Sequence, residues 1–161
     1  MDVFVGDACL LCEDCGIALR EKLEAQGKAP EFPDDETTYD SSEYPKGPYA
    51  DGGGESDSPS HCDHCHCFLE NSLTRDGLEY VNGALREYVA QDGLGAADVL
   101  DLWAEFCADN LDKFTLIAYE AVRRLERNAA AAIAALSQPC FKNAPPIITG
   151  DVAAAINFLK N

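Results

Sequence analysis

The chain has 161 residues, enough for one domain with a small appendage. Hydrophobic residues make up 47% of it, which excludes wholesale disorder, while 29 acidic against 12 basic residues give a formal net charge of -17. A surface this negative repels phosphate groups, so we expect no direct binding to nucleic acid or to anionic membranes. A basic protein partner suits the charge better, and the alternative is that the charge only keeps the chain in solution.

Targeting signals are not visible in the sequence. No apolar run approaches the ~20 residues that cross a bilayer, and the first residues lack the basic and apolar regions of a secretion signal. Eight cysteines in such a chain indicate a metal site in a reducing compartment rather than a disulfide framework. The sequence therefore predicts a cytoplasmic protein.

The first third of the chain predicts a small element followed by an acidic loop. Residues 1–8 predict a short strand or extended lead-in, and residues 15–26 an amphipathic helix that Gly27 ends. Residues 28–60 hold nine acidic residues, two lysines and five prolines. Such a segment buries too little apolar surface to offset its ordering entropy, so we expect a loop unless something fixes it. Tyr39, Tyr44 and Tyr49 are candidates for fixing it, or they cover an edge of the core.

The acidic loop also holds the residues that we expect to contact a partner. They are Asp34, Asp35, Glu36 and Asp40. Four carboxylates within seven positions make a dense negative patch, which steers a basic partner toward it.

The remainder of the chain predicts helices. Thr74 is a candidate N-cap for a helix whose buried face holds Leu78, Val81, Leu85, Tyr88 and Val89, and Gly93 ends that helix. Further helices are predicted at about 96–108, at about 111–136 and from Gly150 to Leu159. The predicted fold class is mainly α: a small N-terminal zinc-ribbon or knuckle-like element in residues 1–75, followed by a helical bundle in residues 76–161.

Two clusters of cysteine and histidine carry the clearest chemical signal. The first runs from Cys9 to Cys15 and the second from His61 to Cys67, and each contains Cys-x2-Cys. That spacing lets two thiolates from one tight turn approach a tetrahedral ion, with each sulfur ~2.3 Å from zinc. We expect the ligands to be Cys12, Cys15, Cys62 and Cys65, because Gly16 after Cys15 lets the first turn take a positive φ.

Other ligand sets stay open at this point. Cys9 and Cys12 compete as the first pair, and a second zinc ion would use Cys9, His64 or Cys67. Disulfides or free thiols in the clusters are a further alternative. Cys107 and Cys140 lie apart from both clusters and are expected to be buried small residues.

The predicted zinc ion is structural, since four thiolates leave no position for water. The sequence lacks the His-x-Glu and Pro-Cys-x2-Cys pattern of zinc deaminases, the Gly-x-Ser-x-Gly of hydrolases and a phosphate-binding loop with its lysine. We therefore expect no enzyme.

Part of the chain resembles a known group of sequences. The stretch Gly52–Cys65 reads GGGESDSPSHCDHC, Phe68–Val81 reads FLENSLTRDGLEYV, and Leu102–Phe106 reads LWAEF. In order and wording these resemble small uncharacterised proteins of bacteriophages and mobile elements. The resemblance implies a bacterial host cytoplasm and Cys62 and Cys65 as metal ligands, but no activity. The chain departs from that pattern at His66, where a glycine is expected.

These observations together predict an interaction protein. The expected protein is a zinc-stabilised acidic module that binds and inhibits a basic host protein, such as nucleic-acid-processing defence machinery in the manner of anti-CRISPR proteins. The alternative is a zinc-ribbon regulator that contacts nucleic acid, for which Arg123, Arg124 and Arg127 are the only basic cluster. An enzyme of unknown class is the third alternative.

Overall fold

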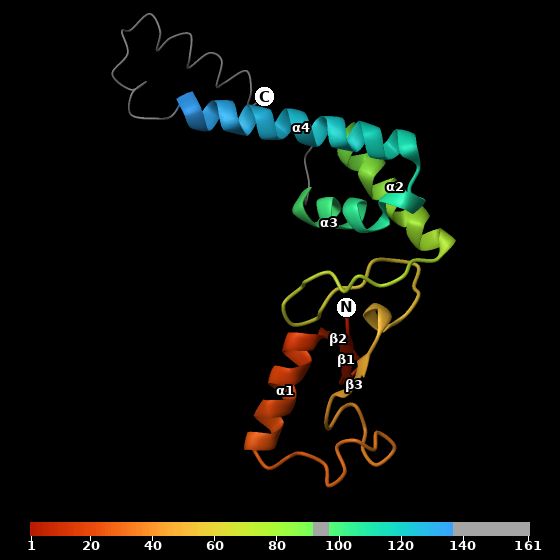
Figure 1. Cartoon of the computed structure of the whole chain (residues 1–161), viewed down its shortest axis with the longest axis vertical. Coiled ribbons are helices and arrows are strands. Elements are labelled where there is room, and N and C mark those ends of the chain that lie inside the picture. Colours follow the sequence, from red (N-terminus) through yellow and green to blue (C-terminus); the bar gives the residue numbers. More distant parts are fainter. Residues whose placement is uncertain (92–96, 137–161) are drawn as a thin grey trace, which may run out of the picture.

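The computed structural model describes residues 1–91 and 97–136. A three-stranded antiparallel sheet and one helix lie at one end of the molecule, and three helices lie at the other (Figure 1). The strands are β1 (Val3–Gly6), β2 (Cys9–Cys12) and β3 (Lys46–Tyr49), and the helices are α1 (Glu13–Ala25), α2 (Arg75–Ala90), α3 (Ala97–Cys107) and α4 (Lys113–Leu136). Two 3-10 turns, η1 (Asp51–Gly53) and η2 (Ala108–Asn110), join them.

This architecture confirms the coarse prediction of a mainly helical protein with a small N-terminal element that holds a cysteine cluster. A zinc-ribbon fold is not shown. Within the described ranges, none of the helices combines the length and the apolar character needed to cross a bilayer.

The N-terminal sheet is built on a hairpin that the sequence did not predict. β1 pairs antiparallel with β2, with Val3 opposite Cys12 and Gly6 opposite Cys9. The turn residues Asp7 and Ala8 both have positive φ, +51° and +61°, which is typical of two-residue hairpin turns. Their sequence lacks the Asn-Gly or Asp-Gly signal for such a turn. β3 pairs with the other side of β1, so β2 lies at the edge of the sheet.

Helix α1 packs closely against this sheet at Gly16. A Cβ at that position would overlap the ring of Phe4, which projects from β1. Gly16 lies inside α1 and has an ordinary helical conformation. The expected reason for this glycine, a positive φ in a metal-binding turn, was therefore wrong. The residue is glycine because the helix approaches the strand closely.

The acidic segment 28–60 is fixed to α1 by Arg20. Its guanidinium group donates to the carbonyl oxygens of Pro45 and Gly47 at 2.8 to 3.0 Å. The same group lies 4.7 Å from the centre of the Phe4 ring and 5.2 Å from that of Tyr44. Charge-assisted hydrogen bonds and cation–π contacts thus stabilise one conformation of the segment, which its composition alone does not show.

The three tyrosines of the segment contribute as well. The hydroxyls of Tyr44 and Tyr49 donate to the carboxylates of Glu24 and Glu36, both at 2.7 Å. The Tyr39 hydroxyl donates to a backbone carbonyl, and its ring packs edge-on against the buried Tyr44. The expectation of a loop holds for much of the segment but was wrong for β3 and η1, and the tyrosines hold it in place.

The helices agree closely with the sequence pattern. Thr74 caps α2 by accepting a hydrogen bond from the Gly77 N–H at 3.1 Å, as predicted. The predicted apolar face of α2 is buried or packed against the core. The predicted positions of α3 and α4 are confirmed to within two residues. Gly93, the predicted helix from Gly150 and Cys140 lie outside the described residues.

Two apolar clusters form the interior. The N-terminal cluster holds the buried residues Val3, Phe4, Leu11, Cys12, Cys62 and Leu69, and the helical cluster holds ten buried residues from Phe68 to Tyr119. Adjacent residues of one segment, Phe68 and Leu69, therefore belong to different clusters. Figure 1 shows that segment between the sheet and the helices. The predicted division at residue 75 remains a prediction.

Candidate metal centre

The first cysteine pair lies where β2 becomes α1. Cys12 is the last residue of the strand and the N-cap residue of the helix, and Cys15 lies in the first turn of that helix. The free N–H groups and the dipole of a helix N-terminus stabilise thiolates. The antiparallel pairing of Cys12 with Val3 fixes the position of this pair relative to the sheet.

The second pair lies on a tight turn closed by backbone hydrogen bonds. His61 and Phe68 face each other in an antiparallel bridge, and the Cys62 N–H donates to the Cys67 carbonyl at 2.9 Å. His66 donates its N–H to the Cys62 carbonyl at 2.8 Å and has φ of +63°. A left-handed conformation after Cys65 is the one that glycine adopts most easily, so the chain keeps the turn geometry although it carries histidine there.

Asp63 joins the two pairs, and the sequence analysis missed it. Its backbone N–H donates to the Leu10 carbonyl at 2.8 Å, and its carboxylate accepts from the Leu10 N–H at 2.7 Å. The turn is thereby bonded to the open edge of β2 at Leu10, two residues from Cys12. The only sequence signal is a carboxylate inside the second Cys-x2-Cys, which on its own has many explanations.

The sulfurs of Cys12, Cys15, Cys62 and Cys65 all lie within 4.8 Å of one another. Those of Cys12 and Cys65 are 3.6 Å apart. A disulfide requires about 2.05 Å, whereas a tetrahedron with ~2.3 Å metal–sulfur bonds has edges of about 3.8 Å. The seven cysteines of the described ranges are all free thiols. The predicted quartet is therefore close enough to hold a metal ion, and its size fits tetrahedral sulfur coordination.

The electrostatics of the quartet favour a cation. Burial alone would raise the pKa of Cys62, but the backbone N–H groups of Cys65, Cys12 and His64 lower that pKa to about 6. Burial, together with the neighbouring thiols, raises the pKa of Cys15 strongly. Cys62 thus ionises readily while Cys15 resists ionisation, chiefly because Cys15 is desolvated by burial and to a smaller extent because Cys62 would be charged beside it. A divalent cation removes this conflict.

The alternative ligands lie around this quartet. Cys9 is at the far end of β2, opposite Gly6, and does not belong to the group of four. His64 lines a cavity of about 310 Å³ beside Cys15. Cys67 is the alternative that interacts with the quartet, since burial and then the thiols of Cys65 and Cys12 raise its pKa to about 12. His61, by contrast, accepts a hydrogen bond from the Trp103 indole at 3.4 Å and faces the helices.

The four predicted partner-binding residues have different roles. The hydroxyl and N–H of Thr37 lower the pKa of Asp35, and the N–H and hydroxyl of Ser42 lower that of Asp40. Glu36 accepts from the Tyr49 hydroxyl and the Gly47 N–H, and its pKa is also lowered, first by that tyrosine. All three stay ionised, but they shape their own loop. Asp34 is exposed.

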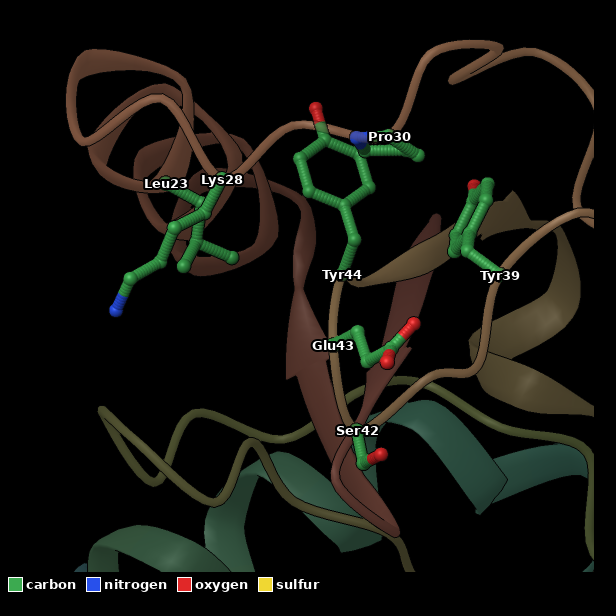
Figure 2. Close-up of a pocket in the computed structure, with 7 residues that line it drawn as sticks. All are labelled: Leu23, Lys28, Pro30, Tyr39, Ser42, Glu43 and Tyr44. Carbon is green, nitrogen blue, oxygen red and sulfur yellow. The ribbon is translucent and has the colours of Figure 1, made fainter.

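A second hollow lies within the acidic segment. Its volume is about 550 Å³, and it is lined by Leu23, Lys28, Pro30, Tyr39, Ser42, Glu43 and Tyr44. Figure 2 shows the Lys28 amino group and the Glu43 carboxylate pointing in different directions. The two tyrosine rings in its wall are buried and their hydroxyls already have partners. The hollow therefore offers no converging set of polar groups for chemistry.

Comparisons of the chain with models of protein families, with curated proteins and with solved structures find no match. The phage-type resemblance thus remains a sequence-based prediction, and the functional argument rests on the geometry of this chain.

Proposed function

We propose that Cys12, Cys15, Cys62 and Cys65 hold one structural zinc ion. Four sulfur donors at tetrahedral spacing are the set that zinc prefers among the common biological cations, and they leave no position for a substrate or a water molecule. When bound, the ion supplies a cross-link between β2, α1 and the 62–67 turn. A closed site that only cross-links three segments supports a scaffold rather than an enzyme.

We infer that the scaffold presents the acidic segment 28–60 to a basic protein. The observation that carries this is the way the segment is held: Arg20 and three tyrosines fix its backbone, while Glu31, Asp34 and Glu43 extend into solvent. A fixed array of exposed carboxylates costs less ordering entropy on binding than a flexible one. Long-range attraction between opposite charges then accelerates encounter.

Proteins that process nucleic acids are the partner class that this surface suits best, because their basic channels accept closely spaced negative charges. Occupying such a channel would inhibit the partner, which agrees with the phage-type resemblance and with an anti-defence role. Direct nucleic-acid binding by this chain is less favoured, because Arg123 of the predicted basic cluster is held internally by Asp101 and Glu126.

The test uses residues whose charge can be removed without disturbing the loop. A variant with Glu31→Gln, Asp34→Asn and Glu43→Gln loses three exposed charges. The matched control, Glu105→Gln with Asp109→Asn and Glu120→Gln, loses the same number from the exposed surface of the helical region. Both are immobilised and exposed to bacterial lysate at low salt, then washed at increasing salt.

We expect the wild-type protein and the control to retain the same basic protein, and the loop variant to lose it at much lower salt. Exposed charges are screened beyond about 8 to 10 Å near physiological ionic strength, so the retained partner should also elute as salt rises. Equal retention by all three proteins would leave solubility as the only role of these acids.

A further inference from the structure

Helix α4 has a second apolar face that the fold does not use. Thr115 and Tyr119 point into the core. On another side of the helix Phe114, Ile117 and Leu125 are 84%, 63% and 69% exposed. Ala118 and Ala121 are exposed between them. Positions three and four apart share one face of a helix, so these five residues form one continuous apolar stripe.

Such a stripe is unusual for a chain with a net charge of -17. Single exposed apolar residues are common on protein surfaces, whereas contiguous ones mark contact sites. None of the residues that the structure describes, 1–91 and 97–136, covers this stripe.

We propose that this stripe is the interface of a homodimer in which two α4 helices pack antiparallel about a two-fold axis. The order of side-chain sizes along the stripe supports a second copy as the occupant. Small residues, Ala118 and Ala121, lie at its centre, and large ones, Phe114 and Leu125, lie near its ends. With the axis between the two alanines, each Phe114 meets Leu125 of the other copy and each Ala118 meets Ala121. Small residues at the centre let the two helices approach closely, which is the self-complementarity that a two-fold interface requires.

The charge distribution supports the same occupant. Two copies of so acidic a chain repel each other most strongly at their acidic segments. Helix α4 differs from the rest of the chain, because it carries four basic and two acidic residues. Lys113 and Arg124 border the stripe and are exposed. This face is therefore the surface at which two copies meet with the least repulsion.

The length over which the two α4 helices overlap determines the expected affinity of the dimer. Centred on the alanines, the two helices overlap from Lys113 to Glu126, a length of about 20 Å at ~1.5 Å per residue. A contact of this length between two single helices is small compared with the interfaces of stable complexes, which bury ~1,200 to 2,000 Å². The expected dimer is therefore weak, and it tightens as salt screens the repulsion between the two chains.

Sedimentation velocity of the full chain tests this directly. From about 1 to 300 µM, a range suited to an interface of this size, we expect a monomer–dimer equilibrium that shifts toward dimer as salt is raised. Ala121→Glu places two like charges at the centre of the interface and should weaken dimerisation at least about tenfold. Ala18→Glu adds the same charge to an exposed position of α1 and should leave the equilibrium near that of the wild type. A monomer throughout the range, or equal effects of the two substitutions, would overturn the proposal.

A photo-crosslinking amino acid in place of Phe114 identifies what covers the stripe. We expect a cross-linked dimer whose link maps close to Leu125 of the second copy. A link within one chain to residues 137–161 would instead assign the stripe to the chain's own C-terminal segment, and a link elsewhere or none would also contradict the dimer. Circular dichroism of each variant checks that the helices are unchanged.

Discussion

The two ends of this molecule reach an ordered structure by different means. The helical region buries ten residues in one apolar cluster, drawn mostly from regularly spaced positions of three helices. The N-terminal region buries six, two of which are cysteines of the metal quartet. A core that small contributes little to stability, and small modules usually need a metal ion or disulfides in addition. The comparison indicates that the cysteines take the place of a larger core.

Each region also relies on one arginine, with different partners. Arg20 donates to backbone carbonyls, which do not titrate. Arg123 donates to the carboxylates of Asp101 and Glu126, next to the hydroxyls of Tyr88 and Tyr119. The contacts that Arg20 makes to the acidic segment therefore do not depend on acid ionisation, whereas the contacts of Arg123 between α3 and α4 do depend on it.

Metal removal should produce the largest difference in stability between the two regions. Structural zinc contributes on the order of 10 kcal/mol to the folding of small modules. A chelator should therefore increase hydrogen exchange throughout residues 1–70 and leave α2 and α4 protected, as measured by mass spectrometry of peptides. Adding zinc back should restore protection, and protection that ignores the chelator would contradict a structural metal.

Single cysteine substitutions should reproduce this contrast in graded form. Cys62→Ser removes a fully buried ligand and should cost several kcal/mol, because the remaining thiolates lose their cation. Cys65→Ser should cost less, since Cys67 lies beside it and is free to replace it. Cys107→Ser, in the helical core, should cost only about 1 to 3 kcal/mol for burying a hydroxyl. Melting temperatures in zinc-containing buffer would show this order or refute it.

Removal of Arg123 should destabilise the helical region. Arg123→Met leaves the Asp101 and Glu126 carboxylates without their cation, and we expect a loss of about 2 kcal/mol in urea unfolding. This is below the value for fully buried pairs, because the Asp101 side chain is 37% exposed.

The pH dependence of this contribution follows from the direction in which folding shifts the pKa of Asp101. Hydrogen bonds from Arg123 lower the pKa of Asp101 in the folded state, although burial opposes them. The stabilisation is therefore fully present above the unfolded-state pKa of about 4 and is lost as pH falls through the folded-state value. Arg123→Met should abolish this part of the acid sensitivity. An unchanged pH profile in the variant would show that Asp101 gains nothing from Arg123.

The features that the sequence predicted well are those with a short-range signal. The Thr74 cap and the apolar positions of α2 follow from local spacing, and the two Cys-x2-Cys motifs identify the quartet that the structure brings together. What the sequence could not show depends on contacts between distant residues. Arg20 lies 25 residues from Pro45, and Asp63 lies 53 residues from Leu10. Neither partnership leaves a pattern in the chain, so the role of Arg20 in fixing the acidic segment and the bonding of Asp63 to β2 were missed.

A pair of glycine substitutions gives the smallest and most controlled comparison of the two regions. Alanine is favoured over glycine inside a helix by up to about 1 kcal/mol. In α1, however, a Cβ at Gly16 would overlap the Phe4 ring. Overpacking of this kind costs about 1 to 3 kcal/mol, so Gly16→Ala should destabilise the N-terminal region despite its better helix propensity.

Gly83→Ala in α2 is the matched control, because a Cβ there meets no atom within 4 Å. Only the propensity term applies at that position, and we expect a gain of about 0.5 to 1 kcal/mol in urea unfolding. The two substitutions add the same methyl group to a helical residue, Gly16 in the first turn of α1 and Gly83 in the middle of α2, so an opposite sign indicates the close approach of α1 to β1. If Gly16→Ala also stabilised the protein, the contact between α1 and the sheet would have room to adjust, and the tight packing inferred beside the metal centre would be wrong.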